Sequence, residues 1–252
     1  MEFGRTMPVE ESASPLNHVV DRCLTIDCTA PLSIALVDRL NAFCSSAEGT
    51  GAPLVCLIRL TGADTATAGQ WPAPVEIHLV NKWELALRRL ERLDAVTVAL
   101  VEANCGGPAF DVVLAVDYRV ATADARLCPP SLAGDVWPGM GLYRLANQFG
   151  VAAARRLLLF AEEMTSAVAE RIGLIDETGD PVSILEARVP ILRTRAGSEL
   201  AIRRRLLLDA TSVSFEDALG SHLAACSRAL TRGSDNLGVL FPPSAGEPAR
   251  RR

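Results

Sequence analysis

The clearest candidate for chemistry in the sequence is an acidic residue that follows a glycine turn. Gly106, Gly107 and Pro108 come directly after an apolar run, and Asp111 lies on the first turns of the helix that the pattern predicts next. Proline suits the first helical position because its missing N–H would be unpaired there in any case. Two glycines allow a sharp turn and a close approach of a ligand to the backbone. The start of a helix then offers free N–H groups and partial positive charge to an anionic oxygen.

Two interpretations of Asp111 follow from this pattern. An acid one turn into such a helix could move a proton beside an oxygen that is held at the helix start. Alternatively, Asp111 only complements the positive end of the helix dipole, and the glycine pair is an ordinary turn between a strand and a helix. The spacing of the residues leaves both interpretations open.

The composition argues against several classes of protein. The chain has 252 residues, of which 49% are hydrophobic and 22% charged, and this is a globular composition. Its net charge of -5 gives no overall attraction to nucleic acid. The 3 histidines lack the spacing of metal ligands, so no metal site is expected. The 7 cysteines form no C-x-x-C pair, which favours reduced thiols in a cytoplasmic protein. No apolar run has the length of a membrane span, and the amino terminus lacks the core of a signal peptide.

The elements that must position Asp111 alternate between strands and helices. A half-buried strand is predicted over 18–28, a helix over 31–49 and a buried strand over 52–62. A helix over 81–94 places Trp83, Leu87 and Leu90 on one face, and a buried strand over 95–104 leads into the glycine turn. This alternation implies βαβ units and a right-handed parallel sheet.

Beyond residue 121 the pattern becomes mostly helical. Six helical candidates are expected at 141–150, 151–160, 165–173, 183–195, 198–210 and 214–233, the last with Ser214 as its N-cap. The chain is therefore expected to have four regions. These are a flexible leader over 1–17, an α/β core over 18–180, a helical oligomerisation region over 181–232 and a disordered tail over 233–252.

Several of these motifs together resemble the enoyl-CoA hydratase/isomerase (crotonase) family. The resemblance covers roughly residues 18 to 230 and is most specific in four places. These are the glycine turn followed by an acid, the D-Y-R-V-A strand, the P-G-M-G turn, and A-x-x-x-G-L-I-D-E ending at Glu177. The resemblance implies a crotonase-type ββα superhelix with a helical carboxyl-terminal region, assembled as trimers or dimers of trimers.

In that family two backbone N–H groups bind the carbonyl oxygen of a CoA thioester. Ala68 and Gly69 match the family's A-G pair, which makes the N–H of Gln70 the first donor. The turn at Gly106 and Gly107 corresponds to the second donor. The resemblance therefore implies that Ala68, Gly69 and Gly106 help to hold the thioester, and that Gln70 and Gly107 stabilise its oxygen. It implies no cofactor, because the coenzyme A thioester is the substrate.

The match to the hydratase site is incomplete. Asp111 falls where hydratases carry their first catalytic glutamate, but Ser131 falls where they carry the second. Pro108 falls at or beside the glycine that supplies the second N–H, and proline has none. A register shift of one residue would give that role to Gly107. Losing one such donor costs about a hundred- to a thousandfold in rate, so the resemblance implies a weakened site.

Four segments are similar to a branch of the family that serves a type III polyketide synthase together with a second crotonase-family protein. They are VNKWELALRRLERLDAVTVA, CGGPAFDVVLAVDYRVA, WPGMGLYRLANQFG and ELAIRRRLLLDATSVSFEDALGSHLAACSRAL. This similarity implies a homo- or hetero-oligomeric helper that promotes dehydration and aromatisation of a polyketide CoA thioester to 3,5-dihydroxyphenylacetyl-CoA. Two alternatives remain open at this point. One is a binding subunit that activates the synthase without chemistry, and the other is a stand-alone enoyl-CoA hydratase.

Overall fold

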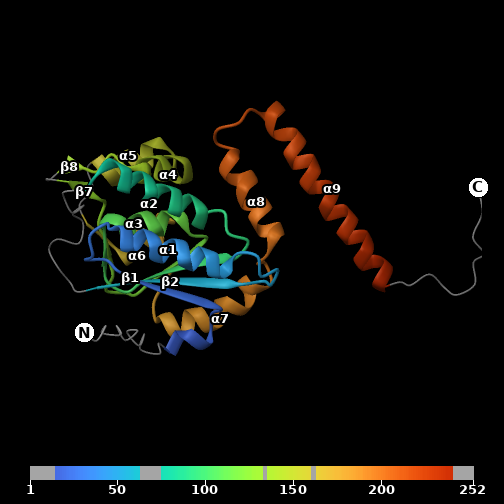
Figure 1. Cartoon of the computed structure of the whole chain (residues 1–252), viewed down its shortest axis with the longest axis horizontal. Coiled ribbons are helices and arrows are strands. Elements are labelled where there is room, and N and C mark those ends of the chain that lie inside the picture. Colours follow the sequence, from blue (N-terminus) through green and yellow to red (C-terminus); the bar gives the residue numbers. More distant parts are fainter. Residues whose placement is uncertain (1–14, 63–74, 133–134, 160–162, 241–252) are drawn as a thin grey trace, which may run out of the picture. The chain divides into compact units, whose positions relative to one another are not determined.

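The computed structural model describes residues 15–62, 75–132, 135–159 and 163–240 (Figure 1). The chain divides into two compact units, with the boundary between Ala201 and Ile202. The first unit contains the sheet and all the described residues around Asp111. The domain limits expected at residues 180 and 232 stay predictions.

A five-stranded parallel sheet forms the centre of the first unit. Its strands follow the order β1 (Arg22–Asp27), β2 (Val55–Thr61), β3 (Val96–Val101), β5 (Tyr118–Ala121) and β10 (Glu177–Thr178). Every neighbouring pair in this order is parallel, so the predicted parallel sheet is confirmed. Strand β3 is buried at every position because both faces of the sheet are covered.

Helices cover both faces of this sheet (Figure 1). One face packs against α1 (Ile34–Ala47), α2 (Ile77–Leu90) and α3 (Gly107–Ala115), and the shared core includes Ile58, Leu40 and Trp83. The other face packs against the short helix η1 (Pro15–His18) and against α7 (Pro181–Arg193), around Leu57, Val98 and Leu185. The alternation of side chains along each strand explains the two cores, since successive residues point to opposite faces.

Shorter elements connect this body to its later helices. A second sheet contains β4 (Asn104–Cys105), β6 (Arg126–Leu127) and β9 (Met164–Thr165), and β7 (Ser131–Leu132) pairs with β8 (Asp135–Val136). The helices that follow are α4 (Met140–Phe149), α5 (Val151–Leu159), α6 (Ser166–Arg171), α8 (Ser198–Asp209) and α9 (Phe215–Leu240).

The structure corrects three element boundaries. The strand expected from residue 18 begins at Arg22, because the residues before it form η1. The helix expected over 81–94 begins at Ile77 and ends at Leu90, where the N–H of Leu93 donates to the Leu90 carbonyl at 3.2 Å in a tighter turn. The last helix, expected over 214–233, runs from Phe215 to Leu240.

Three further features bear on function. The side-chain hydroxyl of Ser214 accepts the N–H of Asp217 at 3.2 Å, so the predicted N-cap of α9 is confirmed. All seven cysteines have free thiols, and Cys28, Cys44, Cys56 and Cys105 are buried. Among the described residues, every helix is too short or too polar to cross a membrane.

Candidate active site

The start of helix α3 has the geometry that the glycine turn predicts. Gly106 is extended, with a φ of -149°, whereas Gly107 has a φ of 52°, a left-handed conformation that favours glycine. Pro108 then occupies the first turn of the helix. The N–H groups of Ala109 and Phe110 both donate to the carbonyl of Gly106, at 3.2 and 3.4 Å. Pro108 has no N–H, so Gly107 carries the amide directly before it at this helix start.

Asp111 lies inside the protein, on the buried helix α3. Only 1% of its surface is exposed. One carboxyl oxygen, Oδ2, accepts a hydrogen bond from the indole Nε1 of Trp83 at 3.3 Å, and the other, Oδ1, has no hydrogen-bond partner among the described residues. A methyl group built on Gly141 of α4 would stand 3.0 Å from Oδ1. Gly141 therefore leaves the space that the Asp111 carboxyl occupies.

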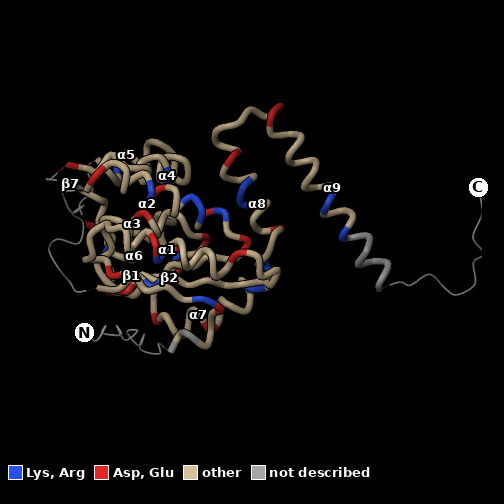
Figure 2. The backbone as a smooth tube through the Cα atoms, viewed as in Figure 1, with Lys and Arg blue, Asp and Glu red and all other residues tan. Residues whose placement is uncertain are grey.

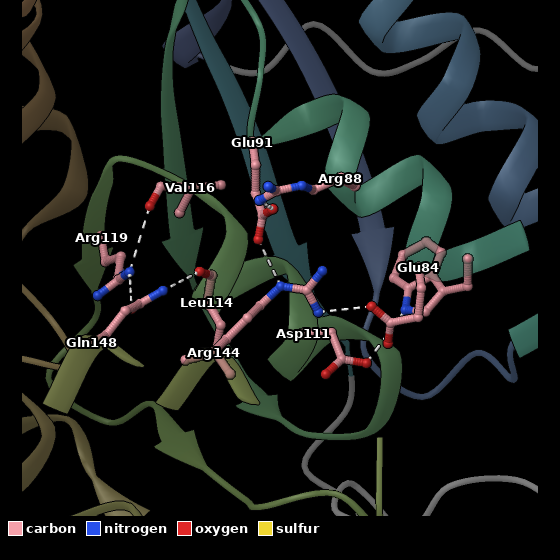
Figure 3. Close-up of polar contacts among 10 residues, drawn as sticks. Glu84, Arg88, Glu91, Asp111, Leu114, Val116, Arg119, Arg144 and Gln148 are labelled. Atoms are coloured by element: carbon pink, nitrogen blue, oxygen red, sulfur yellow. Dashed lines mark hydrogen bonds and ion pairs between the residues drawn. The ribbon is translucent and has the colours of Figure 1, made fainter. Parts of the chain in front are cut away.

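A network of charged side chains lies beside Asp111 (Figure 3). The buried guanidinium of Arg144, on α4, pairs with Glu84 at 2.8 Å and with Glu91 at 2.7 Å. Glu91 also pairs with Arg88 at 3.0 Å. Burial lowers the pKa of Arg144, but Glu91 and Glu84 raise it by more, so its guanidinium keeps its charge. The network therefore joins α2 to α4 immediately beside the carboxyl on α3.

The surroundings raise the pKa of Asp111 to about 7. Burial is the largest cause, because it disfavours the charged form, and the negative charge of Glu84 acts in the same direction. The positive charge of Arg144 and the hydrogen bond from Trp83 lower the pKa of Asp111 by less. A carboxyl group with this pKa is present in both forms at neutral pH, so it can accept or deliver a proton.

The other residues expected at the site are only partly described. Ala68, Gly69 and Gln70 lie outside the described residues, so their roles stay predictions. Gly106 is the N-cap of α3, and Ser131 is half-buried on β7, paired with Val136 of β8. Among the described side chains, no group of three His, Cys, Asp or Glu residues is placed to hold a metal ion.

Sequence reasoning missed the network around Asp111. Trp83 was expected to be a core residue, and it is fully buried, but its indole N–H also contacts Asp111. Glu84, Arg88 and Glu91 are spaced so that they share one face of α2. The acid-base-acid spacing of these three residues was the available signal. Arg144 lies in the helix expected over 141–150, and nothing in the local pattern indicates that it faces Asp111.

The parallel sheet, the helix that starts at a glycine turn and the buried acid on that helix define a protein of the enoyl-CoA hydratase/isomerase class. The model of that family, described as Enoyl-CoA hydratase/isomerase, matches residues 62–230. An "Enoyl-CoA-hydratase" of Amycolatopsis orientalis is 40% identical over 210 residues, which are 83% of this chain and 95% of the relative. This protein therefore belongs to the enoyl-CoA hydratase/isomerase (crotonase) family.

Solved structures agree with the fold. An enoyl-CoA hydratase/isomerase from Marinobacter aquaeolei superposes with a TM-score of 0.67 at 16% identity, covering 86% of this chain and 92% of the other. An enoyl-CoA hydratase from Mycobacterium smegmatis also has a TM-score of 0.67, at 18% identity, covering 91% and 97%. The Pseudomonas aeruginosa protein AtuE gives 0.67 at 21% identity, covering 90% and 95%. These likenesses confirm the predicted crotonase fold with its helical carboxyl-terminal region.

Proposed function

We propose that the protein binds a polyketide CoA thioester and promotes its dehydration and aromatisation to 3,5-dihydroxyphenylacetyl-CoA, as the helper of a type III polyketide synthase. The observation that carries this proposal is the buried Asp111 carboxyl on the helix that starts at Gly107, with a pKa of about 7. Four segments of the sequence resemble the B protein of the dihydroxyphenylglycine pathway, which serves such a synthase with a second crotonase-family protein. The free, mostly buried thiols fit a cytoplasmic location.

The proposed chemistry needs one oxygen ligand and one proton carrier. Loss of water from a β-hydroxyacyl thioester breaks a bond from hydrogen to the α-carbon and a bond from oxygen to the β-carbon. Negative charge then grows on the thioester oxygen, where the N–H of Gly107 would donate a hydrogen bond. Asp111 would move the proton that turns the leaving hydroxyl into water. The aromatic product is much more stable than the polyketide, so a site with one weakened donor can suffice.

The synthase reaction tests this proposal directly. The synthase is incubated with malonyl-CoA, with and without this protein, and the products are identified by mass. We expect more 3,5-dihydroxyphenylacetyl-CoA when the protein is present. Replacing Asp111→Asn keeps the shape of the side chain but removes the acid, so the stimulation should fall at least about tenfold. If the products are the same with and without this protein, at every ratio of the protein to the synthase, the proposal is wrong.

A binding subunit without chemistry is the second candidate. Two observations favour it, because Pro108 has no N–H to offer and the Asp111 carboxyl is only 1% exposed. In this case the protein stabilises or activates the synthase by contact. The Asp111→Asn variant separates the two functions, since unchanged stimulation by a variant that still binds the synthase would favour the binding subunit.

A stand-alone hydratase is the third candidate. It is favoured by the 40% identity to a relative named as an enoyl-CoA-hydratase. A hydration assay with a short enoyl-CoA and without the synthase tests it. Turnover at a rate typical of enzymes, about 1–1000 per second, would replace the helper function with this one.

A further inference from the structure

Two neighbouring carboxyl groups each leave one oxygen atom without a hydrogen bond. In the part of the chain that the structure describes, Oδ1 of Asp111 and Oε1 of Glu84 are buried and have no hydrogen-bond partner. Figure 3 shows the two carboxyl groups next to each other, one from α3 and one from α2. A buried ionised carboxyl group normally accepts several hydrogen bonds, and leaving an oxygen unpaired is costly. The pair is therefore more stable when one of the two groups carries a proton.

Arg144 determines which of the two groups carries the negative charge. Its guanidinium donates to Oε2 of Glu84 at 2.8 Å and to Oε1 of Glu91 at 2.7 Å. Two carboxylates thus surround this one buried cation, and Arg88 adds a second, more exposed cation at Glu91. The charges of these four residues balance. Ionised Asp111 would be a third carboxylate without a cation of its own.

Two of the remaining features that face Asp111 favour its ionised form. On α2, the indole of Trp83 donates a hydrogen bond that favours the ionised form. On β4, the buried thiol of Cys105 lies close enough to Asp111 that the carboxylate helps to raise the thiol's pKa, after its contact with Cys28 and its burial. The amino end of α3 itself favours a negative charge. Burial and Glu84 outweigh these effects at Asp111.

We propose that Glu84, fixed by Arg144, is a positioning residue that keeps part of the Asp111 population protonated at neutral pH, so that Asp111 is the acid of the dehydration step. Asp111 then gives its proton to the leaving hydroxyl while the bond from oxygen to the β-carbon breaks, and the electron pair of that bond leaves with the water. The proton of the α-carbon passes to solvent, and the electron pair of its C–H bond forms the double bond between the α- and β-carbons. Solvent then returns a proton to Asp111. The acid role at Asp111 rests on the proposed function, whereas the effect of Glu84 on Asp111 does not.

This arrangement supplies a second carboxyl group from a different element. The family resemblance places Ser131, which has no acid, at the position of the second catalytic glutamate. Glu84 comes instead from helix α2 and acts through Asp111. We propose no contact between Glu84 and the substrate.

The test reads the protonation of Asp111 without any substrate. Trp83 is one of 3 tryptophans, so the variant Trp71→Phe with Trp137→Phe leaves its fluorescence as the only indole signal. Ionisation of Asp111 should change this signal, because Trp83 donates to its carboxyl. We expect a titration with a midpoint near pH 7 in this parent protein. Asp111→Asn should abolish the titration.

Glu84→Gln should move the midpoint down by about one pH unit or more, because it removes a negative charge and leaves Arg144 less compensated. Glu76→Gln is the matched control, since Glu76 precedes the same helix, is exposed and pairs only with His78 in the described contacts. It should leave the midpoint where it is. An unchanged midpoint in Glu84→Gln overturns the inference.

A second variant covers the case in which Glu84→Gln does not fold. Glu84→Asp keeps the carboxylate, so its midpoint should stay within about half a unit of the parent value. A larger fall in Glu84→Asp, or a parent midpoint below about pH 5, also overturns the inference.

The activity assay separates this inference from the proposed function. If Asp111 acts as the acid, stimulation of the synthase falls as pH rises through the fluorescence midpoint, and Glu84→Gln moves that fall to lower pH. If the fluorescence behaves as expected but no dehydration occurs at any pH, the effect of Glu84 on Asp111 is supported and the proposed function is wrong. If dehydration occurs but its pH profile does not follow the fluorescence, the acid role of Asp111 is wrong.

Discussion

The carboxyl of Asp111 is buried without a cation of its own, and this placement couples its protonation to folding. Its pKa is raised from 3.8 to about 7 in the folded protein. A raised pKa means that the folded state holds the proton more tightly than the unfolded chain does. The contribution to stability is complete below the unfolded value and is lost as pH rises from about 3.8 to about 7.

We therefore expect Asp111→Asn to remove part of this pH dependence. The asparagine cannot ionise, so the variant should lose less stability between pH 5 and pH 8 than the native protein, by roughly 1–3 kcal/mol. Unfolding by urea at the two pH values measures the difference. If the native protein and the variant change stability by the same amount over this interval, Asp111 is already ionised in the folded state.

Pro108 is the second residue whose chemistry can be tested alone. It occupies the first turn of α3 and contributes no N–H. Pro108→Gly would restore a donor, and we expect hydration of a short enoyl-CoA to rise, by up to about a hundredfold if the register places residue 108 at the thioester oxygen. Pro108→Ala is the control for the loss of the ring, because it also restores the N–H without the flexibility of glycine. No gain in either variant leaves Gly107 as the donor.

At the level of elements, the site depends on how closely α4 passes over α3. Gly141 lies where these helices meet, and an added methyl group would stand 3.0 Å from Asp111 Oδ1. Contacts this short are rare, so the carboxyl would have to move by a few tenths of an ångström. The position of a catalytic group matters on this scale, since a displacement of 1 Å can cost about a hundredfold in rate.

Gly141→Ala should therefore lower the stimulation of the synthase by roughly 3–10-fold. Its effect on the free energy of unfolding should be within about 1 kcal/mol, because alanine favours the helix while the methyl group crowds the carboxyl. Gly220→Ala is the matched control, since Gly220 lies inside α9 with nothing within 4 Å of an added methyl group. If both variants stimulate the synthase as well as the native protein does, the contact between α4 and Asp111 does not matter for function.

At the level of the whole molecule, the second unit leaves several large apolar side chains exposed to solvent. Leu207 and Phe215 are 74% and 75% exposed, and α8 has no buried residue. A groove of about 410 Å³ is lined by Val213, Leu219 and neighbouring residues. Figure 2 shows charged residues near the two ends of the described part of α9, with uncharged residues between them. Exposed apolar faces of this kind favour association.

We expect the protein to be a homo- or hetero-oligomer that is held together through this unit. Light scattering on the native protein, alone and mixed with the synthase, measures its mass. Phe215→Ser combined with Leu219→Ser should lower that mass, whereas Ile77→Ser, at an 80% exposed residue of the first unit, should not. A native protein that remains a monomer under both conditions contradicts the expectation.

Much of the fold was determined by local sequence. The apolar run of β3 predicted a buried parallel strand, and Trp83, Leu87 and Leu90 predicted the buried face of α2, where all three are fully buried. The turn at Gly106 and Gly107 and the helix that follows were also predicted from residue types. Such features depend on neighbours within a few residues, which is why a single sequence reveals them. The two-residue strand β10 was missed, because it is too short to show a period.

The surroundings of Asp111 were decided by tertiary structure alone. Arg144 and Glu84 are 60 residues apart in the chain, and they meet because α4 packs on α3 and α3 on α2. No periodicity in the sequence encodes which charged side chain of one helix faces an acid on another. Burial then strengthens the electrostatic effect of these neighbouring charges on Asp111, since charges act more strongly where water is excluded. The sequence determined that Asp111 follows a glycine turn, and the packing of three helices determined that its carboxyl holds a proton near neutral pH.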